Sequence, residues 1–442
     1  MNLNIKSKKA NTYDAIVVGT GISGGWAAKE LCEKGLKTLV LERGRNVRHV
    51  VDYPTMNKDP WELPNGDQPT IEHLEKVHPV LGKHSLAKTR PSVQHWYPND
   101  HENPYIEKKG FGWIRGYHVG GKSLMWGKQS YRLSDLDFEA NAKEGIAVDW
   151  PIRYKDIAPW YDYVETFAGI SGQKEGLAHL PDGKFLPPMD MNCVEKHVSE
   201  KIRENFENRI MTIGRTAMLT QPHNGRGKCQ YRNRCKRGCP YGAYFSSNSA
   251  TLPAAEVTGN MELKPNSIVN RILYDENNQK ATGVKVIDSE TNEVKEYYAK
   301  IIFLNASTLG STYILLNSTS NRFPNGLGND SGELGHNLMD HHFSVGASGE
   351  HTGFKDSYYS GRRANGIYIP RYRNITTKET DYIRGFGYQG GASREDWRRG
   401  IKELGFGAGF KDNLTKPGTW KMGLVAFGEC LPYHKNQVAL TT

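Results

Sequence analysis

The chain has 442 residues, of which 37% are hydrophobic and 24% are charged, and its formal net charge is +10. This composition excludes global disorder, the apolar runs are too short for a membrane-spanning helix, and six cysteines are too few for a disulfide scaffold. The length predicts about two or three domains, and the positive charge admits nucleic acid, an anionic cofactor or an acidic partner protein.

The N-terminal residues 1–12 contain three lysines and no apolar segment, a pattern that does not make a secretory signal. We therefore expect a chain that carries no export signal of its own. Such a chain would stay in the cytoplasm, or it would reach the periplasm bound to a partner subunit that has a signal.

Residues 13–42 predict a strand, a glycine loop, a helix and a second strand. Val and Ile dominate residues 13–19, as in a strand that is buried on both faces. A G-x-G-x-x-G loop follows at 19–24, and apolar residues at helical spacing predict a helix over 26–34. Residues 36–41 predict the second strand, which ends at an acidic residue.

The parts of this unit have physical roles in binding a dinucleotide. Gly19 permits a tight turn, Gly21 lets the backbone approach a pyrophosphate, and Gly24 lets the helix pack closely on the strand. The N-terminus of the helix that follows offers unpaired N–H groups to the phosphates. Ile22 and Ser23 of the loop are also predicted to bind the cofactor.

The acidic residue at the end of the second strand belongs to the same pattern. Glu42 can accept hydrogen bonds from a ribose diol, and its charge disfavours the 2′-phosphate of NADP. Its neighbour Arg43 completes this part of the predicted site. The unit alone does not distinguish NAD from FAD, and an ordinary glycine turn remains the alternative.

A second glycine motif occupies residues 115–127. Gly120 and Gly121 precede small and polar residues, which suits a backbone that passes close to a ligand, with a surface turn as the alternative. With the first loop, this motif resembles the glucose–methanol–choline (GMC) flavin oxidoreductases, in which an R-G-x-x-x-G-G-x-S element lies along the FAD pyrophosphate and flavin. The resemblance implies FAD contacts at Gly120, Gly121, Ser123, Leu124, Met125 and Trp126.

The resemblance also bears on how the flavin is attached. Some members of the family have a His where Met125 stands, and that His bonds covalently to the flavin. Because Met does not form this bond, we expect FAD to be held non-covalently.

Later segments carry the same resemblance. Residues 301–316 look like the second dinucleotide-fold segment of the family, which implies FAD contacts at Ala306 and Ser307. The predicted strands around 262–287 look like those near the adenine, which implies contacts at Ile268 and Val269. Elements at 149–152 and 335–341 also match, so the resemblance extends from residue 13 to about residue 349.

The fold class that this resemblance implies is α/β. We expect an FAD-binding domain of Rossmann type, assembled from separated chain segments, with an inserted, sheet-rich substrate domain. The expected bounds are 1–46, 111–149 and 211–344 for FAD binding, 47–110 for an irregular excursion or lid, and 150–210 and 345–442 for the substrate domain.

Three cysteines, Cys229, Cys235 and Cys239, form a C-x5-C-x3-C cluster in the basic loop 226–242. Clustered thiols suggest a soft metal, and zinc usually takes four ligands, so an iron–sulfur cluster with three thiolates fits better. Positive charge around the thiols stabilises thiolates and the reduced state of such a cluster.

The loop resembles that of the large subunits of FAD-dependent glucose dehydrogenase and gluconate 2-dehydrogenase. In those proteins a three-Cys motif of this spacing binds a 3Fe–4S cluster, although many relatives carry an additional Cys within the first spacing. Three reduced thiols without metal are one alternative. A zinc-stabilised loop that binds nucleic acid is the other.

The sequence assigns no catalytic residue. The family places its catalytic His in a C-terminal segment, and nothing after Gly349 resembles that segment. The last histidine, His434, stands in a turn-like context without the family pattern. We therefore expect the catalytic segment to lie beyond Thr442, in a longer enzyme of which this chain is a fragment.

The function that the resemblance implies is oxidation of a CH–OH group in a sugar, a polyol or an aldonate, with hydride transfer to FAD. Electrons would leave through the iron–sulfur cluster to a cytochrome-type acceptor, and a small subunit is a further expected partner. No nucleic acid and no transmembrane segment are expected. A metal-free GMC alcohol oxidase or dehydrogenase, and a basic zinc-loop protein that binds nucleic acid, remain the alternatives.

Overall fold

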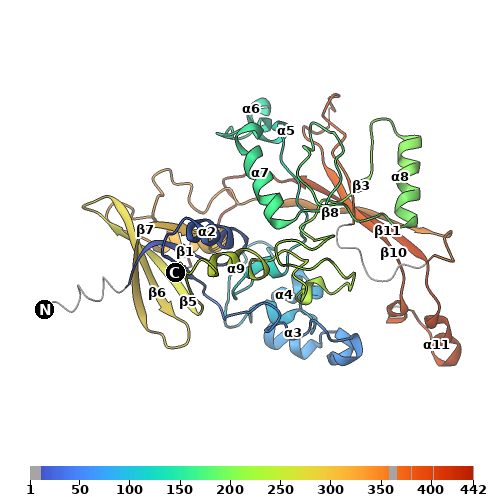
Figure 1. Ribbon diagram of the computed structural model, residues 1–442, viewed down its shortest axis with the longest axis horizontal. Helices are drawn as coiled ribbons and strands as arrows, with labels where there is room; N and C mark the ends of the chain where they lie inside the picture. The colour runs from blue at the N-terminus through green and yellow to red at the C-terminus, as the bar shows by residue number, and fades with distance from the viewer. Residues whose placement is uncertain (1–10, 358–365, 380, 402, 442) are drawn as a thin grey trace. The chain divides into compact units, whose positions relative to one another are not determined.

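The structure of the protein is a computed structural model that describes residues 11–357, 366–379, 381–401 and 403–441 (Figure 1). The N-terminal residues 1–12, from which we expect no export signal, therefore lie mostly outside the described residues. The chain divides into two compact units. The first comprises Met1–Gly127, Arg234–Leu338 and Tyr433–Thr442, and the second comprises Lys128–Asn233 and Met339–Pro432.

The first unit is built around a six-stranded sheet in the order β4-β2-β1-β7-β6-β5. Its helices and strands are β1 (Thr12–Val18), α2 (Ile22–Glu33), β2 (Thr38–Leu41), α3 (Ile71–Val77), α4 (Leu81–His84), α9 (Thr251–Glu256), β4 (Met261–Lys264), β5 (Ser267–Asp275), β6 (Lys280–Asp288), β7 (Val294–Leu304) and α10 (Thr308–Asn317).

Four neighbouring strands of this sheet, β4, β2, β1 and β7, run parallel, whereas β6 and β5 pair antiparallel. Ala15 of β1 stands in register with Thr38 on one side and Ile301 on the other. Because parallel strands end at the same edge, the chain leaves β1, β2 and β7 side by side at that edge.

Alternate side chains of β1 pack into two different hydrophobic layers, as the period of a strand requires. Ala15 and Val17 pack with α2 and α9, and Ile16 and Val18 pack with β5, β6 and α10. All four side chains are almost completely buried. The predicted strand that is covered on both faces is therefore present.

The helix of the predicted strand–helix–strand unit begins four residues earlier than expected, at Ile22 rather than at residue 26. Gly21 is its N-cap residue and has extended backbone angles, so the glycine loop turns directly into the helix. The apolar spacing used for the prediction missed this first turn because that turn contains Ser23 and Gly24.

The second unit contains a five-stranded sheet in the order β3-β9-β10-β11-β8, with antiparallel pairing throughout. Its helices and strands are α5 (Asp135–Phe138), α6 (Ala140–Glu144), α7 (Tyr154–Ala168), α8 (Cys193–Asn205), β3 (Thr212–Ile213), β8 (His341–His351), β9 (Ile367–Ile369), β10 (Gly387–Arg394), α11 (Gly407–Thr415) and β11 (Trp420–Glu429).

The N-terminus of α8 is attached to this sheet by its capping residues. Asn192 Oδ1 accepts from Glu195 N at 3.0 Å, and Glu195 Oε2 accepts from Asn192 N at 2.9 Å. The same two side chains also bond to the backbone of Ala392 in β10, at 2.8 and 2.9 Å. A capping box that also pairs with a strand fixes where the helix starts and where it lies.

The predicted fold class is confirmed: the chain is α/β, with a mixed sheet that contains four parallel strands and is built from separated segments, and with an inserted sheet-rich unit. The bounds of the units differ in places from the expected ones. Residues 128–149 and 211–233, expected in the FAD-binding domain, belong to the second unit. Residues 433–442, expected in the substrate domain, belong to the first.

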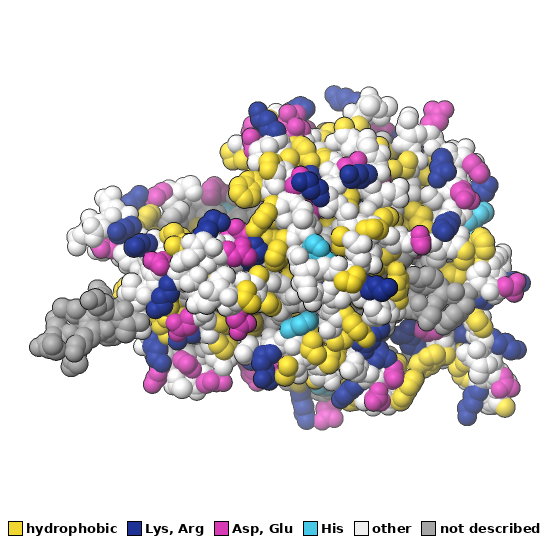
Figure 2. Space-filling view, in the orientation of Figure 1, with side chains coloured by type: hydrophobic (Ala, Val, Ile, Leu, Met, Phe, Trp, Pro, Cys, Tyr) yellow, Lys and Arg dark blue, Asp and Glu magenta, His cyan; other side chains and the backbone are white. Residues whose placement is uncertain are grey.

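Charged side chains of both signs are scattered over the face of the molecule shown in Figure 2. On the face shown in Figure 2, Lys and Arg are interspersed with Asp and Glu and do not gather into one patch of a single sign. None of the helices that the structure describes combines the length and the apolar character that crossing a lipid bilayer requires.

A buried ion network connects α7 to the loop before α5. Arg132 donates from Nε to Glu165 Oε1 at 2.9 Å and from Nη2 to Asp162 Oδ1 at 2.5 Å, and its side chain is only 3% exposed. Glu165 is 7% exposed at the side chain. The desolvation cost of burying Arg132 and Glu165 is offset only because the two charges form a well-aligned pair.

We expect Glu165→Leu to lower the free energy of unfolding by about 3–5 kcal/mol, because it leaves the Arg132 guanidinium buried without its main partner. Urea unfolding followed by circular dichroism measures this loss. Glu72→Gln is the control, since Glu72 and Lys76 form an exposed pair, and its loss should stay below about 1 kcal/mol. Equal losses in the two variants would contradict the prediction.

Candidate functional site

All predicted cofactor-binding residues lie in the first unit, so their mutual geometry is defined. They are Gly19, Gly21, Ile22, Ser23, Gly24, Glu42, Arg43, Gly120, Gly121, Ser123, Leu124, Met125, Trp126, Ile268, Val269, Ala306 and Ser307. The ends of β1, β2 and β7 bring three of the segments that carry them together.

The three glycines of the first loop meet different surroundings. A Cβ on Gly19, whose φ is +96°, would lie 2.5 Å from Asn305 O, and a Cβ on Gly24 would lie 1.9 Å from Gly19 O. A Cβ on Gly21 would meet no protein atom within 4 Å. Packing of the protein therefore requires glycine at positions 19 and 24, whereas Gly21 faces open space.

Glu42 lies buried at the end of β2 and faces the glycine loop. Its Oε2 accepts from the backbone N of Thr20 at 3.1 Å and from the Thr20 hydroxyl at 2.5 Å, and its Oε1 accepts from Gly44 N at 3.1 Å. Burial raises the pKa of the Glu42 carboxyl above its ordinary value, while the hydrogen bonds from Thr20 and Gly44 oppose that rise. Contact between Glu42 and a ribose stays a prediction.

The second glycine motif meets the first through the same threonine. Gly120 N donates to Thr20 Oγ1 at 2.9 Å, so Thr20 connects Gly120 to Glu42. A Cβ on Gly121 would lie 3.4 Å from the Cα of Gly21. Two motifs that are about one hundred residues apart in sequence are thus in direct contact.

The residues after the second glycine pair turn into the protein. Ser123 donates to Gly120 O at 2.6 Å, and Trp126 Nε1 donates to Phe245 O at 3.0 Å. Leu124 and Met125 are buried in one cluster with Val47, Tyr53 and Trp96. The side chain of Met125 is therefore held by packing.

Two further predicted segments reach the same edge of the sheet. The turn at Ala306 and Ser307 lies between β7 and α10, with Ser307 at φ +65°, and it packs on Gly19 through Ala306 Cα. At the start of β5, Ser267 N donates to Glu42 O at 2.8 Å. Ile268 follows with a partly exposed side chain, whereas Val269 is buried in the core.

Sequence reasoning missed Thr20, Ser247 and Asn305. Ser247 donates from its hydroxyl to Gly21 O at 3.0 Å and from its backbone N to Ser123 Oγ at 2.9 Å, so it contacts both glycine motifs. Asn305 O lies against Gly19. The one available signal for Ser247 was the run of small polar residues at 246–251.

The three predicted metal-ligating cysteines are divided between the units. Cys229 belongs to the second unit, and Cys235 and Cys239 belong to the first. Among the described residues, no group of three or more His, Cys, Asp or Glu side chains is arranged to hold a metal ion. The described structure therefore shows no ligand set for the predicted cluster.

The part of the basic loop in the first unit packs against the excursion at 47–110. Trp96 Nε1 donates to Lys236 O at 2.8 Å, and Arg237 approaches Asp67 at 3.6 Å. Arg234 pairs with Asp59. Acidic residues of the excursion thus offset some of the positive charge of the loop.

His434, for which no catalytic role was predicted, stacks on His336 with ring centroids 3.9 Å apart. The ring of His336 also forms a hydrogen bond of 2.8 Å through Nδ1 to the backbone O of His434. These contacts attach the segment around residue 434 to the segment around residue 336. A binding or catalytic role does not follow from them.

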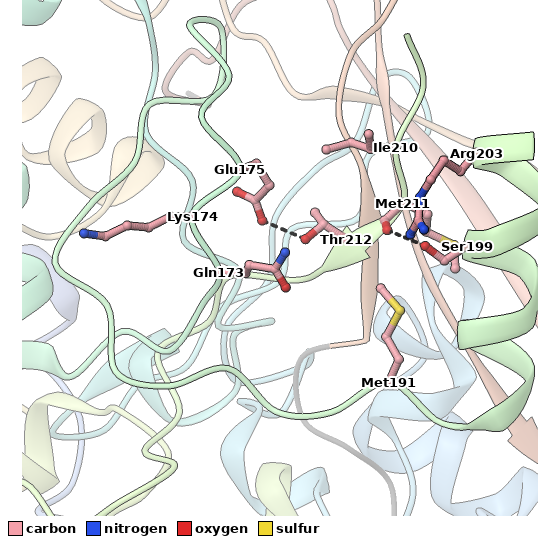
Figure 3. Close-up of a pocket in the computed structure, with 9 residues that line it drawn as sticks. All are labelled: Gln173, Lys174, Glu175, Met191, Ser199, Arg203, Ile210, Met211 and Thr212. Carbon is pink, nitrogen blue, oxygen red and sulfur yellow. Dashed lines mark hydrogen bonds between the residues drawn. The ribbon is translucent and has the colours of Figure 1, made fainter. Parts of the chain in front are cut away.

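A pocket of about 350 Å³ lies in the second unit between residues 173–175, β3 and α8 (Figure 3). Three of its polar side chains are hydrogen-bonded within the protein: Thr212 donates to Glu175 at 2.7 Å, and Ser199 donates to Met211 O at 2.9 Å. Lys174 points away from the other labelled residues in Figure 3. The candidate site is therefore the meeting point of the glycine motifs and not this pocket.

Comparison with known proteins agrees with that geometry. A family model described as GMC oxidoreductase matches residues 13–343. The chain is 27% identical to the 2-methyl-1,2-propanediol dehydrogenase of Mycolicibacterium austroafricanum, over 86% of this chain and 64% of that protein. It is 24% identical to the fructose dehydrogenase large subunit of Gluconobacter japonicus, over 98% of this chain and 77% of that protein.

The gluconate 2-dehydrogenase flavoprotein of Pantoea cypripedii is also 24% identical, over 69% of this chain and 52% of that protein. The chain thus spans between 52% and 77% of the length of these three relatives.

We expect Thr20→Val to lower stability in a pH-dependent way. Without the hydroxyl, the pKa of the buried Glu42 carboxyl rises further above its unfolded value. A carboxyl with a raised folded pKa destabilises the fold increasingly as the pH rises above the unfolded pKa, and protonation relieves this. The free energy of unfolding should fall by about 1.5–3 kcal/mol at pH 8, and this decrease should become smaller toward pH 5.

Urea unfolding at both pH values measures this difference. Thr312→Val is the control, because the Thr312 hydroxyl donates to a helix carbonyl at 2.9 Å and bonds to no carboxylate among the described residues. A loss in Thr20→Val that is the same at pH 5 and pH 8 would show that Glu42 does not depend on Thr20.

Proposed function

The chain belongs to the GMC oxidoreductase family, and from this membership we propose that it carries the FAD-binding machinery of an enzyme that oxidises a CH–OH group. The proposed substrate class is a sugar, a polyol or an aldonate. It is supported by the names of the relatives, which are dehydrogenases of a diol, of fructose and of gluconate. The observation that carries the proposal is the contact between the two glycine motifs around Gly21.

The residues at this contact fit a dinucleotide cofactor. Gly21 is the one glycine of its loop whose added Cβ would meet no protein atom, so a pyrophosphate can approach the backbone there. The N-cap of α2 makes no side-chain hydrogen bond, which leaves first-turn N–H groups for phosphate oxygens. The backbone from Gly120 to Trp126 lies beside the loop and would hold the flavin end.

FAD, when bound, supplies the hydride acceptor for the carbinol carbon. The residues of this chain bind and orient it: Gly19 and Gly24 shape the loop, and Thr20 joins the loop to the second motif. Met125, packed against Gly116, leaves the flavin non-covalently held. No proton transfer is assigned to a residue of this chain.

We further propose that Cys229, Cys235 and Cys239 hold a 3Fe–4S cluster and that electrons pass to a cytochrome-type acceptor. The support is the spacing of the cysteines and the basic character of their loop. Because the described residues form no ligand group, no step of the reaction is derived through this cluster. That same observation favours a second candidate, a metal-free dehydrogenase or oxidase of the family.

Anaerobic purification followed by a visible spectrum and iron and zinc analysis separates these candidates. We expect a flavin spectrum, release of the flavin by acid precipitation, and about three irons per chain. Flavin without iron supports the metal-free enzyme, and zinc without flavin would overturn the proposal. Sugars, polyols and aldonates assayed with an artificial electron acceptor then test the substrate class.

Gly21→Ala tests the cofactor contact directly. Its Cβ would enter the open space at the loop without touching protein, so the thermal midpoint should stay unchanged while the Kd for FAD rises about tenfold or more. Titration of apoprotein with FAD, followed by flavin fluorescence, measures the Kd.

Gly110→Ala is the control for Gly21→Ala, because an added Cβ there also meets nothing within 4 Å and the position lies outside both motifs. If the Kd of Gly21→Ala matched that of the control, FAD would not approach the chain at Gly21.

A further inference from the structure

Asn248 lies buried beside the second glycine motif, although no sequence motif includes it. Its Nδ2 donates to Val47 O at 2.7 Å and to Val119 O at 3.1 Å, and the residue is 5% exposed. Val119 directly precedes Gly120, and Val47 lies five residues after Glu42. The amide group of Asn248 thus joins the segment after β2 to Val119 of the second glycine motif.

The orientation of this amide is determined by its partners. Both contacts of Nδ2 are carbonyl oxygens, which accept only from a donor, so the amide oxygen must face the other way. There Oδ1 lies against Gly120, where an added Cβ would come within 1.7 Å of it. Among the described residues Oδ1 has no hydrogen-bond partner, and it is buried.

Gly120 is therefore held from two sides. Its N–H donates to Thr20 Oγ1, which donates to Glu42, and the amide oxygen of Asn248 occupies the space that a side chain on Gly120 would need. Asn248 also bonds to Val47, which the chain connects back to Glu42. These contacts form a closed ring that joins β2, the first glycine loop and the second glycine motif.

We propose that Asn248 is a positioning residue for FAD, which acts by fixing the second glycine motif relative to the first. Its Nδ2 is engaged with protein carbonyls and its Oδ1 is buried, so it acts through Val119 and Gly120 and not by touching the cofactor. If FAD binds as proposed, the two motifs would lie along different parts of the dinucleotide, and their spacing would set where the flavin ring sits. The inference rests on the FAD binding of the proposed function.

Asn248→Ala tests this inference. We expect its Kd for FAD to rise about tenfold and the midpoint potential of the flavin to shift at saturating FAD. Asn260→Ala is the matched control, since Asn260 Nδ2 also donates to a backbone carbonyl of the first unit, Cys32 O at 3.0 Å, at the far end of α2. The control should keep the Kd within about twofold and the potential unchanged.

The inference is overturned if Asn248→Ala folds and its Kd and potential match those of Asn260→Ala. If Asn248→Ala fails to fold, Asn248→Ser replaces it in the same comparison with Asn260→Ala. The serine hydroxyl can still donate one hydrogen bond. If the unsubstituted chain binds no FAD, the proposed function itself fails. Unaltered FAD binding by the Asn248 variants, with binding by the unsubstituted chain intact, removes only the role of Asn248.

Discussion

The buried carboxylate of Glu42 is the constraint on which the candidate site depends. A carboxyl group without water needs donors, and here three come from the chain around it, at Thr20 N, the Thr20 hydroxyl and Gly44 N. The bonds from Thr20 to Glu42 attach the end of β2 to the loop after β1. Because the Thr20 hydroxyl also accepts from Gly120, the same requirement places the second motif.

This dependence explains why the site is assembled from segments that are far apart in sequence. Each segment contributes mainly backbone: the glycine loop, the pair Gly120 and Gly121, and the turn after β7. Short side chains such as Thr20 and Ser247 fill the spaces between these backbones and satisfy their polar groups. In such a site the backbone segments pack tightly on one another, as at Gly19 and Gly24. Space for a ligand remains where no protein atom fills it, as at Gly21.

The features that could be predicted from the sequence are those that local patterns encode. The strands around residues 13–41 and the glycine loop follow from short-range spacing, the α/β class follows from the family resemblance, and the structure contains them. Thr20 occupies the variable position of G-x-G, where no local pattern marks it. Ser247 lies 226 residues from its partner Gly21, so the run of small polar residues around it does not show which segment it contacts. The start of α2 was missed because its first turn lacks an apolar face.

The pairing of β1 has a consequence for the synthesis of the chain. β1 is covered by β2 on one side, but its other neighbour, β7, begins about 250 residues after β2 ends. At typical translation rates of roughly 5–20 residues per second, the first three elements wait roughly 13 to 50 s for that strand. During this interval an apolar strand edge is open on the ribosome, so the nascent chain is a natural client for chaperones before it can close its own sheet.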